Sequence, residues 1–352
     1  MNEVHVVVPE GIDDPARPSG GNAYDRRVCD GLEATGWTVR LHPVPGRWPQ
    51  FDATSHAVLG DVVGRIPDGA VVLLDGLVAS TAPDVLVPHA SRLRMVALVH
   101  MPLGLPPADD QTRAREGAVL GAAAAVVTTS AWTRGMLIET YALPGDRVHV
   151  AEPGVDSAAL APGTEDAGAL LCVAAVTPGK GHDVLLDALA AIAGLPWHCR
   201  CVGSFDRDPT FANGIERRAR AGGLGDRVCF AGPMSGAELD RSYGTADLLV
   251  LASRAETYGM VVTEALARGL PVIAADVGGV SEALGHDRDG VAPGLLVPPG
   301  DPAALAAALR AWMDNAALRQ RLRGAARDRR SALPGWTTTT STVAGVLAEA
   351  VA

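Results

Sequence analysis

The sequence predicts an α/β protein made of two doubly wound domains, each with a parallel sheet. Short apolar runs alternate with longer amphipathic segments through most of the chain, as expected for strands that alternate with helices. The alternation stops at residues 152–168, which are rich in Pro, Gly, Ala and acidic residues, and then starts again. A length of 352 residues suits two domains of ordinary size. Such alternation places helices on both faces of each sheet.

Six strands are expected in the first half of the chain, over residues 4–8, 38–42, 71–75, 95–100, 124–128 and 148–151. Helices are expected between several of them, including residues 24–34, 83–91 and 133–141. The first run, at the amino terminus, lacks the basic and long apolar regions of a signal peptide and is interpreted as a buried strand. The first domain is therefore placed at residues 1–155.

The second half repeats the pattern, with strands expected at 169–175, 198–203, 228–231, 248–252, 271–275 and 294–297. The helices expected here include 183–192, 236–243, 260–268 and 302–313. The second domain is placed at residues 156–336. A last helix, expected at 337–352 after the break at 333–336, can pack back on the first domain. In doubly wound sheets, ligands bind beyond the carboxyl ends of the strands, so the loops that follow strands are the candidate sites.

Composition excludes several classes of function. The net charge of −10 argues against a protein that coats nucleic acid phosphates, and neither half of the chain has a net positive charge that would favour anionic lipid. No apolar run approaches the ~18 residues that span a bilayer. The five cysteines lack CxxC spacing, and Cys199 and Cys201 alternate along one expected strand. They are interpreted as packed thiols in a reduced, cytoplasmic protein rather than as metal ligands.

The only lysine of the chain lies in a loop where chemistry is expected. Of the 30 basic residues, Lys180 alone is a lysine, and it follows a strand and precedes a helix. Backbone N–H groups and the helix dipole favour an anion at such a place, and a compact ammonium can meet a diphosphate. The spacing is not that of a P-loop. A surface lysine without a role, in a composition biased toward Arg, is the alternative.

A second loop carries two carboxylates. Residues 253–266 follow the expected strand 248–252 and run into a helix, with Glu256 in the turn and Glu264 about two turns inside the helix it introduces. Amides near residues 257–260 can then contact a phosphate, and the carboxylates can accept hydrogen bonds from sugar or ribose hydroxyls. The alternative is that Glu256 is a capping acid and Glu264 a solvated helix residue.

The order of these elements resembles the large retaining glycosyltransferase family usually numbered four. The matching elements are Gly20-Gly21, His100, residues 127–130 with 153–156, 179–183, the Glu-x7-Glu block within 253–266, and 271–282. The similarity covers nearly the whole chain, strongly after residue 124 and weakly between 40 and 90. It implies the GT-B fold, with two facing Rossmann-like domains, the first on the acceptor side and the second binding the donor.

The resemblance also implies roles for individual residues. Lys180 would bind the donor diphosphate, Glu256 the hydroxyls of the transferred sugar, and Glu264 the ribose. His100 would face the sugar across the cleft, and a structural role is its alternative. The implied catalytic residues are Glu256, His100 and Lys180. The implied donor-binding residues are Gly20, Gly21, Lys180, Gly232, Met234, Arg254, Glu256, Thr257, Tyr258, Gly259, Met260 and Glu264.

One position departs from the family pattern. Family members usually carry an Arg five residues before the lysine, clamping the same diphosphate, and this chain has Ala175 there. Arg254 or Arg207 is a candidate replacement. Without one, the leaving diphosphate loses a charge-assisted hydrogen bond of about 1.5–3 kcal/mol. A non-catalytic nucleotide-sugar-binding protein is therefore an alternative, as is a nucleotide-sugar epimerase on the same fold.

The expected reaction transfers a hexose-type sugar from a UDP- or GDP-sugar to a hydroxyl of an acceptor, with a small molecule favoured over a lipid. Departure and attack on the same face, rather than a covalent intermediate, is the mechanism that the resemblance favours. Two Asp-Arg-Asp triplets, at 206–208 and 287–289, have the spacing of a metal motif but lie in expected loops. We therefore expect no catalytic metal and no cofactor besides the nucleotide-sugar co-substrate.

Overall fold

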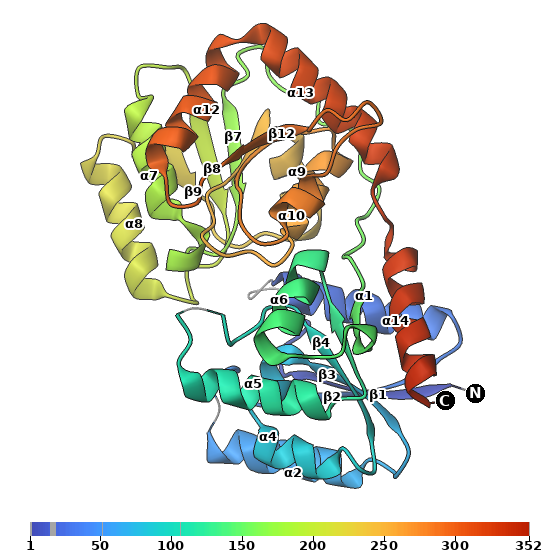
Figure 1. Cartoon of the computed structure of the whole chain (residues 1–352). Coiled ribbons are helices and arrows are strands. Elements are labelled where there is room, and N and C mark those ends of the chain that lie inside the picture. Colours follow the sequence, from blue (N-terminus) through green and yellow to red (C-terminus); the bar gives the residue numbers. More distant parts are fainter. Residues whose placement is uncertain (1, 15–18, 51, 106, 352) are drawn as a thin grey trace. The chain divides into compact units, whose positions relative to one another are not determined.

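The computed structural model describes residues 2–14, 19–50, 52–105 and 107–351. The chain divides into two compact units (Figure 1). Within the described residues, unit 1 comprises 2–13, 19–154 and 334–351, and unit 2 comprises residue 14 and 155–333. Each unit contains one six-stranded sheet in which all paired strands are parallel. The predicted fold class of two doubly wound α/β domains is confirmed.

The strands of unit 1 are β1 (Glu3–Pro9), β2 (Thr38–Val44), β3 (Val71–Asp75), β4 (Arg94–Val99), β5 (Ala125–Thr128) and β6 (Val148–Val150). Their order in the sheet is β2-β1-β3-β4-β5-β6. Each strand predicted for the first half of the chain is present, with bounds that differ by at most two residues. The direction of winding reverses between β1 and β3, so the switch point of this sheet lies at their carboxyl ends.

Helices cover both faces of the unit 1 sheet. They are α1 (Gly20–Ala34), α2 (Ala53–Arg65), α3 (Gly76–Ala79), α4 (Pro83–Leu86), α5 (Asp110–Ala122), α6 (Ala131–Tyr141) and α14 (Trp336–Val351), with 3₁₀ turns η1 (Val87–His89) and η2 (Gly145–Arg147). One core cluster joins the sheet to α1 and α14, and another joins the opposite face to α2 and α5. The chain's last helix thus completes the core of unit 1.

The first helix begins earlier than the sequence predicts. Ser19 caps α1 by accepting a hydrogen bond from the Asn22 amide, so Gly20 and Gly21 form the first turn of the helix rather than a loop before it. Glycine lowers helix propensity, which is why the pattern placed the start at Tyr24. The cap overrides that cost.

The strands of unit 2 are β7 (Ala169–Val173), β8 (His198–Val202), β9 (Val228–Phe230), β10 (Leu248–Leu251), β11 (Val272–Ala275) and β12 (Gly294–Val297). They are ordered β12-β11-β10-β7-β8-β9. All six predicted strands of this half are present. Here the winding reverses between β7 and β10, which makes the loops after these two strands the flanks of the switch point.

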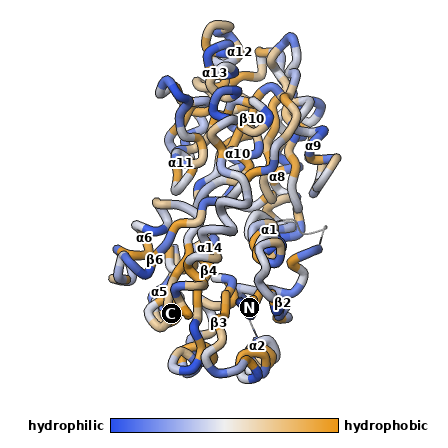
Figure 2. Tube along the Cα trace, turned by 90° about the vertical axis from the view of Figure 1, so that its right-hand side faces the viewer, coloured by the Kyte–Doolittle hydropathy of each residue, from blue (hydrophilic) through white to orange (hydrophobic). Residues whose placement is uncertain are grey.

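The helices of unit 2 are α7 (His182–Ala191), α8 (Pro209–Ala221), α9 (Gly236–Gly244), α10 (Met260–Ala267), α11 (Val280–Leu284), α12 (Pro302–Asp314) and α13 (Ala316–Arg329), with 3₁₀ turns η3 (Pro178–Lys180) and η4 (Arg330–Ala332). One core lies between the sheet and α7, α8 and α12, and the second between the sheet and α9, α10 and α11. Hydrophobic residues run along β3 and β4 in unit 1 and along β10 in unit 2 (Figure 2). In the described part of the chain, no helix is long and apolar enough to cross a membrane.

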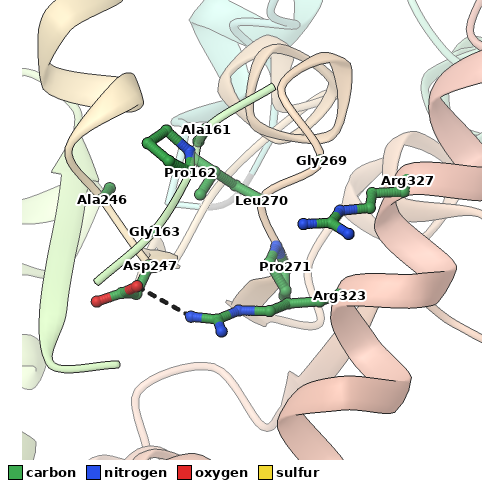
Figure 3. A pocket seen from close by; sticks show the side chains of 10 residues that line it. All are labelled: Ala161, Pro162, Gly163, Ala246, Asp247, Gly269, Leu270, Pro271, Arg323 and Arg327. Atoms are coloured by element: carbon green, nitrogen blue, oxygen red, sulfur yellow. Dashed lines mark hydrogen bonds and ion pairs between the residues drawn. The ribbon is translucent and has the colours of Figure 1, made fainter. Parts of the chain in front are cut away.

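A buried aspartate fixes the segment that enters unit 2. Asp247 accepts hydrogen bonds from the Thr164 amide (2.6 Å), the Thr164 hydroxyl (2.6 Å), the Ala169 amide (2.9 Å) and Arg323 of α13 (2.9 Å; Figure 3). The cavity beside it has a volume of about 10 Å³, room for one water. Asp247 directly precedes β10, so this pocket lies at the amino end of the strand, away from the edge where ligands bind. Asp247 therefore has a structural role.

Candidate functional site

The loops after β7 and β10 lie against each other at the switch point of unit 2. The Arg254 amide donates to the Gly179 carbonyl at 2.8 Å. Gly181 has φ of +66°, and a Cβ atom built on it would lie 1.9 Å from the Ala252 carbonyl oxygen. Only glycine tolerates both the conformation and the approach. The backbone of one loop is therefore locked to the other.

This contact brings together Lys180 and Glu256, two of the three predicted catalytic residues. Lys180 Nζ lies 2.6 Å from Glu256 Oε1, and the Ser253 hydroxyl donates to the same oxygen at 2.8 Å. The Lys180 side chain is 31% exposed and that of Glu256 is 11% exposed. A cation and a hydrogen-bond acceptor are thus held side by side, with the cation the more accessible of the two.

Arg254 is engaged on the same loops. Its guanidinium forms two hydrogen bonds to the Asp183 carboxylate (2.8 and 2.6 Å) and one to the Pro178 carbonyl (2.8 Å). The hydrogen bond from Arg254 lowers the pKa of Asp183 below its usual range, although partial burial opposes this. A diphosphate would have to compete with Asp183 for Arg254. Arg207, the other candidate for the role left open by Ala175, lies exposed on the loop after β8.

The start of α10 supplies amides without a side-chain cap. Gly259 is the N-cap residue with φ of +91°, and it has no side chain to accept from the first turn. Thr257 is half-buried and Tyr258 is buried immediately before it, and Met260 is the first helical residue. The first amides of a helix lack intrahelical partners and favour an anion. The geometry suits the predicted phosphate contacts of residues 258–260.

Glu264 lies about one turn inside α10, not two, because α10 starts at Met260, as predicted, and Glu264 is only four residues further along the helix. Its Oε2 accepts from the Tyr243 hydroxyl at 2.7 Å, and the Arg268 guanidinium lies 4.5 Å from the centre of the Tyr243 ring. Burial raises the pKa of Glu264, although the Tyr243 hydrogen bond and Arg268 oppose the rise. Glu264 is therefore a positioned acceptor and not a freely solvated helix residue.

The loop after β9 carries the remaining predicted donor residues of unit 2. Gly232 has φ of +73°, and its carbonyl accepts from the Gly203 amide at 2.9 Å. Met234 is half-buried and its sulfur accepts from the Ser242 hydroxyl at 3.3 Å. The loop is thereby tied to the loop after β8 and to α9, at the same edge of the sheet as Lys180.

Unit 1 has its own polar cluster at its switch point, which contains the predicted Gly21 and His100. Gly21 packs on the imidazole, since a Cβ atom there would lie 3.2 Å from His100 Cδ2, and Gly20 is exposed beside it. His100 directly follows β4. Its Nε2 lies 2.6 Å from Asp25 Oδ1 of α1 and 3.8 Å from Asp75 Oδ2 at the end of β3.

The two aspartates of this cluster were not predicted. Asp75 ends a strand beside a switch point, a signal that could have marked it, whereas Asp25 sits within a helix and carries no such signal. Burial, and then the neighbouring Asp25, raise the pKa of Asp75 to about 7. Burial alone would lower the pKa of His100, but the charge and hydrogen bond of Asp25, with Asp75, outweigh it and raise it.

A separate group of thiols lies in the core of unit 2. Cys199 and Cys201 are buried on one face of β8, as their alternation predicts. Cys201 also pairs in register with Cys172 of β7, and the Cys172 sulfur lies 3.9 Å from Nε2 of buried His182. Hydrogen bonding to Cys201, and then burial, raise the pKa of Cys172, so it is protonated at neutral pH. Buried thiols of this kind are inert.

The Asp-Arg-Asp triplets lie at loop positions with local partners. Asp208 caps α8 by accepting from the Phe211 amide at 3.0 Å. Asp287 accepts from the amides of Asp289 (2.9 Å) and Val291 (2.8 Å). Both aspartates therefore serve the local backbone.

The match to a protein family coincides with unit 2. Residues 162–329 match the family described as glycosyl transferases group 1. These residues belong to that glycosyltransferase family. The match contains both locked loops, all of β7 to β12 and both glutamates of the Glu-x7-Glu block, so the recognition of a glycosyltransferase from the sequence is confirmed.

Two named relatives align with about half of the chain or somewhat more. It is 36% identical over 231 residues to D-inositol 3-phosphate glycosyltransferase 1 of Catenulispora acidiphila, covering 60% of this chain and 54% of the relative. It is 29% identical over 181 residues to mannosylfructose-phosphate synthase of Agrobacterium fabrum, covering 46% and 40%. The chain spans about half the length of the curated relatives it matches.

Solved structures share the fold over the whole chain. Sucrose-phosphate synthase from Thermosynechococcus elongatus aligns with a TM-score of 0.81 and 22% identity, covering 99% of both chains. HepE of Anabaena, in complex with UDP and glucose, aligns with a TM-score of 0.78 and 17% identity, covering 99% of this chain and 100% of that one. These similarities show that the chain has the GT-B fold.

Proposed function

We propose that the protein is a retaining glycosyltransferase that moves a hexose-type sugar from a UDP- or GDP-sugar to a hydroxyl of a small-molecule acceptor. The observation that carries the proposal is the Lys180–Glu256 pair at the switch point of unit 2, within the residues that match the glycosyltransferase family. A cation for a diphosphate and an acceptor for sugar hydroxyls stand there side by side.

The same groups account for the proposed chemistry. As the donor breaks, negative charge grows on the departing diphosphate. Lys180 and the uncapped amides at the start of α10 are placed to stabilise that charge without reorganisation, which is usually the largest contribution to catalysis. Glu256 orients the sugar as a hydrogen-bond acceptor. The bond from the anomeric carbon to the diphosphate breaks, the acceptor oxygen bonds to that carbon on the same face, and the departing diphosphate oxygen accepts the proton of the acceptor hydroxyl. Because Lys180 and the helix amides compensate the charge of the diphosphate, the proposed reaction needs no metal ion.

The relatives support the proposed substrates. The names of two of them give an inositol phosphate and a mannosylfructose phosphate, and HepE was solved with UDP and glucose. Small phosphorylated polyols and sugars are therefore the acceptors to test first, with UDP-glucose and GDP-mannose as donors. A thermal-shift panel of nucleotide sugars, followed by mass spectrometry with these acceptors, would identify the pair.

A non-catalytic nucleotide-sugar-binding protein is the second candidate, and one observation favours it. Ala175 removes the arginine expected beside Lys180, and Arg254 is engaged with Asp183. Such a protein would bind UDP- or GDP-sugars without transfer or hydrolysis. An epimerase would instead rearrange the donor without an acceptor, and the Glu-x7-Glu block disfavours it.

The division of labour between the two glutamates tests the proposed function. Glu256→Gln should lower kcat about 10- to 100-fold and leave the affinity for free UDP or GDP nearly unchanged, because the sugar is absent from the free nucleotide. Glu264→Gln should weaken the donor and the free nucleotide together, because the ribose is common to both. Calorimetry with the nucleotide and steady-state kinetics with the donor separate the two cases.

A surface variant provides the control. Glu216 lies on α8 and pairs with Arg220 on the helix surface, so Glu216→Gln should change neither kcat nor nucleotide affinity. If Glu256→Gln and Glu264→Gln both behave like this control, the two carboxylates have no part in donor binding and the proposal fails.

A further inference from the structure

His100 is held between two carboxylates that come from different elements of unit 1. Asp25 of α1 and Asp75 at the end of β3 have side chains that are 2% and 3% exposed, and that of His100 is 13% exposed. His100 Nε2 lies 2.6 Å from Asp25 Oδ1 and 3.8 Å from Asp75 Oδ2. A contact of 2.6 Å is short for a nitrogen donor and an oxygen acceptor and is typical of a charge-assisted hydrogen bond.

Each member of the cluster is fixed by its own surroundings. Asp75 caps α3 through Oδ1, which accepts from the Leu77 amide at 2.7 Å and the Val78 amide at 3.4 Å. Tyr24 packs the edge of its ring against His100, with centroids 5.0 Å apart, and donates its hydroxyl to the Ala151 carbonyl at 2.9 Å. The missing side chain of Gly21 leaves room for the imidazole. The ring therefore has one well-defined position.

The two ring nitrogens of His100 have different surroundings. Nε2 is directed at the Asp25 carboxylate, which accepts hydrogen bonds and donates none when it is ionised. Asp25 Oδ2 is buried and has no hydrogen-bond partner within the described residues, so the contact of Oδ1 with His100 Nε2 is the side-chain hydrogen bond observed for this carboxylate there. Within the described residues, Nδ1 of His100 forms no hydrogen bond. It is also not a fully buried atom without a partner, so it remains open to a ligand.

We propose that Asp25 is a positioning residue for His100: it holds the imidazole in the Nε2–H tautomer and so leaves Nδ1 to hydrogen-bond a sugar hydroxyl. Asp75 is the second, weaker partner. An imidazole whose one N–H is bound by a carboxylate has a fixed orientation and a more basic second nitrogen. That the ligand is a sugar rests on the proposed function. The tautomer and the proton affinity of His100 are independent of the proposed function.

The sign of the expected effect follows from the groups that face the ring. These are Asp25 and Tyr24 from α1 and Asp75 from β3. Tyr24 stays neutral because burial, and then Asp25, raise its pKa. Burial lowers the pKa of His100, and the two carboxylates raise it above the ordinary value. Removing the charge of Asp25 should therefore lower the pKa of His100, and removing that of Asp75 should lower it less because that carboxylate is farther away.

NMR of the full chain without substrates tests this. After treatment with EDTA, long-range ¹H–¹⁵N spectra of the wild type should show His100 as the Nε2–H tautomer above its titration midpoint, with the resonance assigned by its loss in His100→Gln. Asp25→Asn should lower the midpoint by about one pH unit or more. Asp75→Asn should lower it less. Asp30→Asn, which removes an exposed carboxylate from the same helix, should leave it unchanged.

Several outcomes would overturn the inference. An Nδ1–H tautomer in the wild type would do so without any variant, so it decides the matter even if Asp25→Asn does not fold. An Asp25→Asn midpoint equal to that of Asp30→Asn would also overturn it, as would a His100 signal that titrates only after a divalent cation has been removed from these three side chains.

Activity provides a separate readout. In the transfer assay, Asp25→Asn should lower kcat about tenfold and leave the KM for the donor nearly unchanged. The part of the pH–rate profile that reports the ionisation of His100 should shift in the same direction as the NMR midpoint. Asp25→Glu, which restores the charge, should recover part of the rate. If no transfer is found with any acceptor, the proposed function fails. The NMR experiment still tests the effect of Asp25 on His100, because it uses the protein without substrates.

Discussion

At the scale of single residues, the choice of lysine at position 180 has a physical basis. The chain uses Arg at every other basic position, yet here the cation must fit beside Glu256 with 2.6 Å between Nζ and Oε1. An ammonium is compact and carries three donors that can rotate, so it can keep Glu256 and still turn toward a phosphate. A guanidinium is planar and rigid, and that of Arg254 already forms two hydrogen bonds to the Asp183 carboxylate.

We expect Lys180→Met to weaken UDP and GDP binding about 10- to 100-fold, because it removes one charge-assisted interaction with the diphosphate and keeps the length of the side chain. Calorimetry with each nucleotide measures the effect, and circular dichroism checks the fold. Arg321→Ala removes one positive charge from an exposed position of α13 in the same unit and should bind as the wild type does. Equal affinities in all three proteins would remove Lys180 from the nucleotide site.

At the scale of elements, the site depends on loops whose geometry only glycine permits. Gly181 starts α7 with a positive φ, and Gly259 does the same for α10. Each glycine ends a loop at the switch point and directs the first amides of its helix toward the edge of the sheet where ligands bind. The positions of Lys180 and Glu256 therefore follow from backbone conformation as much as from their own side chains.

Two alanine substitutions in one loop test this dependence. Gly181→Ala should destabilise the protein by at least about 1–2 kcal/mol, because φ is +66° and the new Cβ would lie 1.9 Å from the Ala252 oxygen. The melting temperature should fall by several degrees, and nucleotide affinity should fall with it because the two loops separate. Gly179→Ala is the control, since its Cβ would meet nothing within 4 Å. Similar melting curves for both variants would contradict the locked-loop description.

The elements also show what the sequence can and cannot predict. Strands β3 and β12 match the prediction residue for residue, because each is a short apolar run with clear ends, and β3 is buried along its whole length. The start of α1 was missed because a serine cap outweighs two glycines. The contact of Asp25 with His100 joins residues 75 positions apart and depends on which strands neighbour one another, so no local pattern reveals it.

At the scale of the whole molecule, one architectural rule operates twice. In unit 1 the winding reverses between β1 and β3, and in unit 2 between β7 and β10. Each reversal gathers polar side chains from the ends of neighbouring strands and the segments that follow them, the Asp25–His100–Asp75 cluster in one unit and the Lys180–Glu256 pair in the other. Sequence order alone separates these residues widely, and the doubly wound topology brings each group together.

The charge at the second of these sites leads to a prediction about metals. In the proposed reaction, Lys180 and the uncapped amides of α10 would supply the positive charge that a divalent cation supplies to a diphosphate in other enzymes. The acidic triplets are occupied locally, since Asp208 caps α8 and Asp287 accepts two backbone amides. Sugar transfer and nucleotide binding should therefore persist after exhaustive dialysis against EDTA.

The measurement compares dialysed protein with and without added Mn²⁺ or Mg²⁺, using the donor and acceptor found in the nucleotide-sugar panel. We expect the two rates to agree within about twofold, since Lys180 and the helix amides are already in place before the donor binds. A loss of transfer that Mn²⁺ restores would contradict this and give the triplets a role as ligands. Asp206→Asn and Asp287→Asn would then locate the metal, because only the variant that lacks a true ligand would need more Mn²⁺ for half-maximal rate.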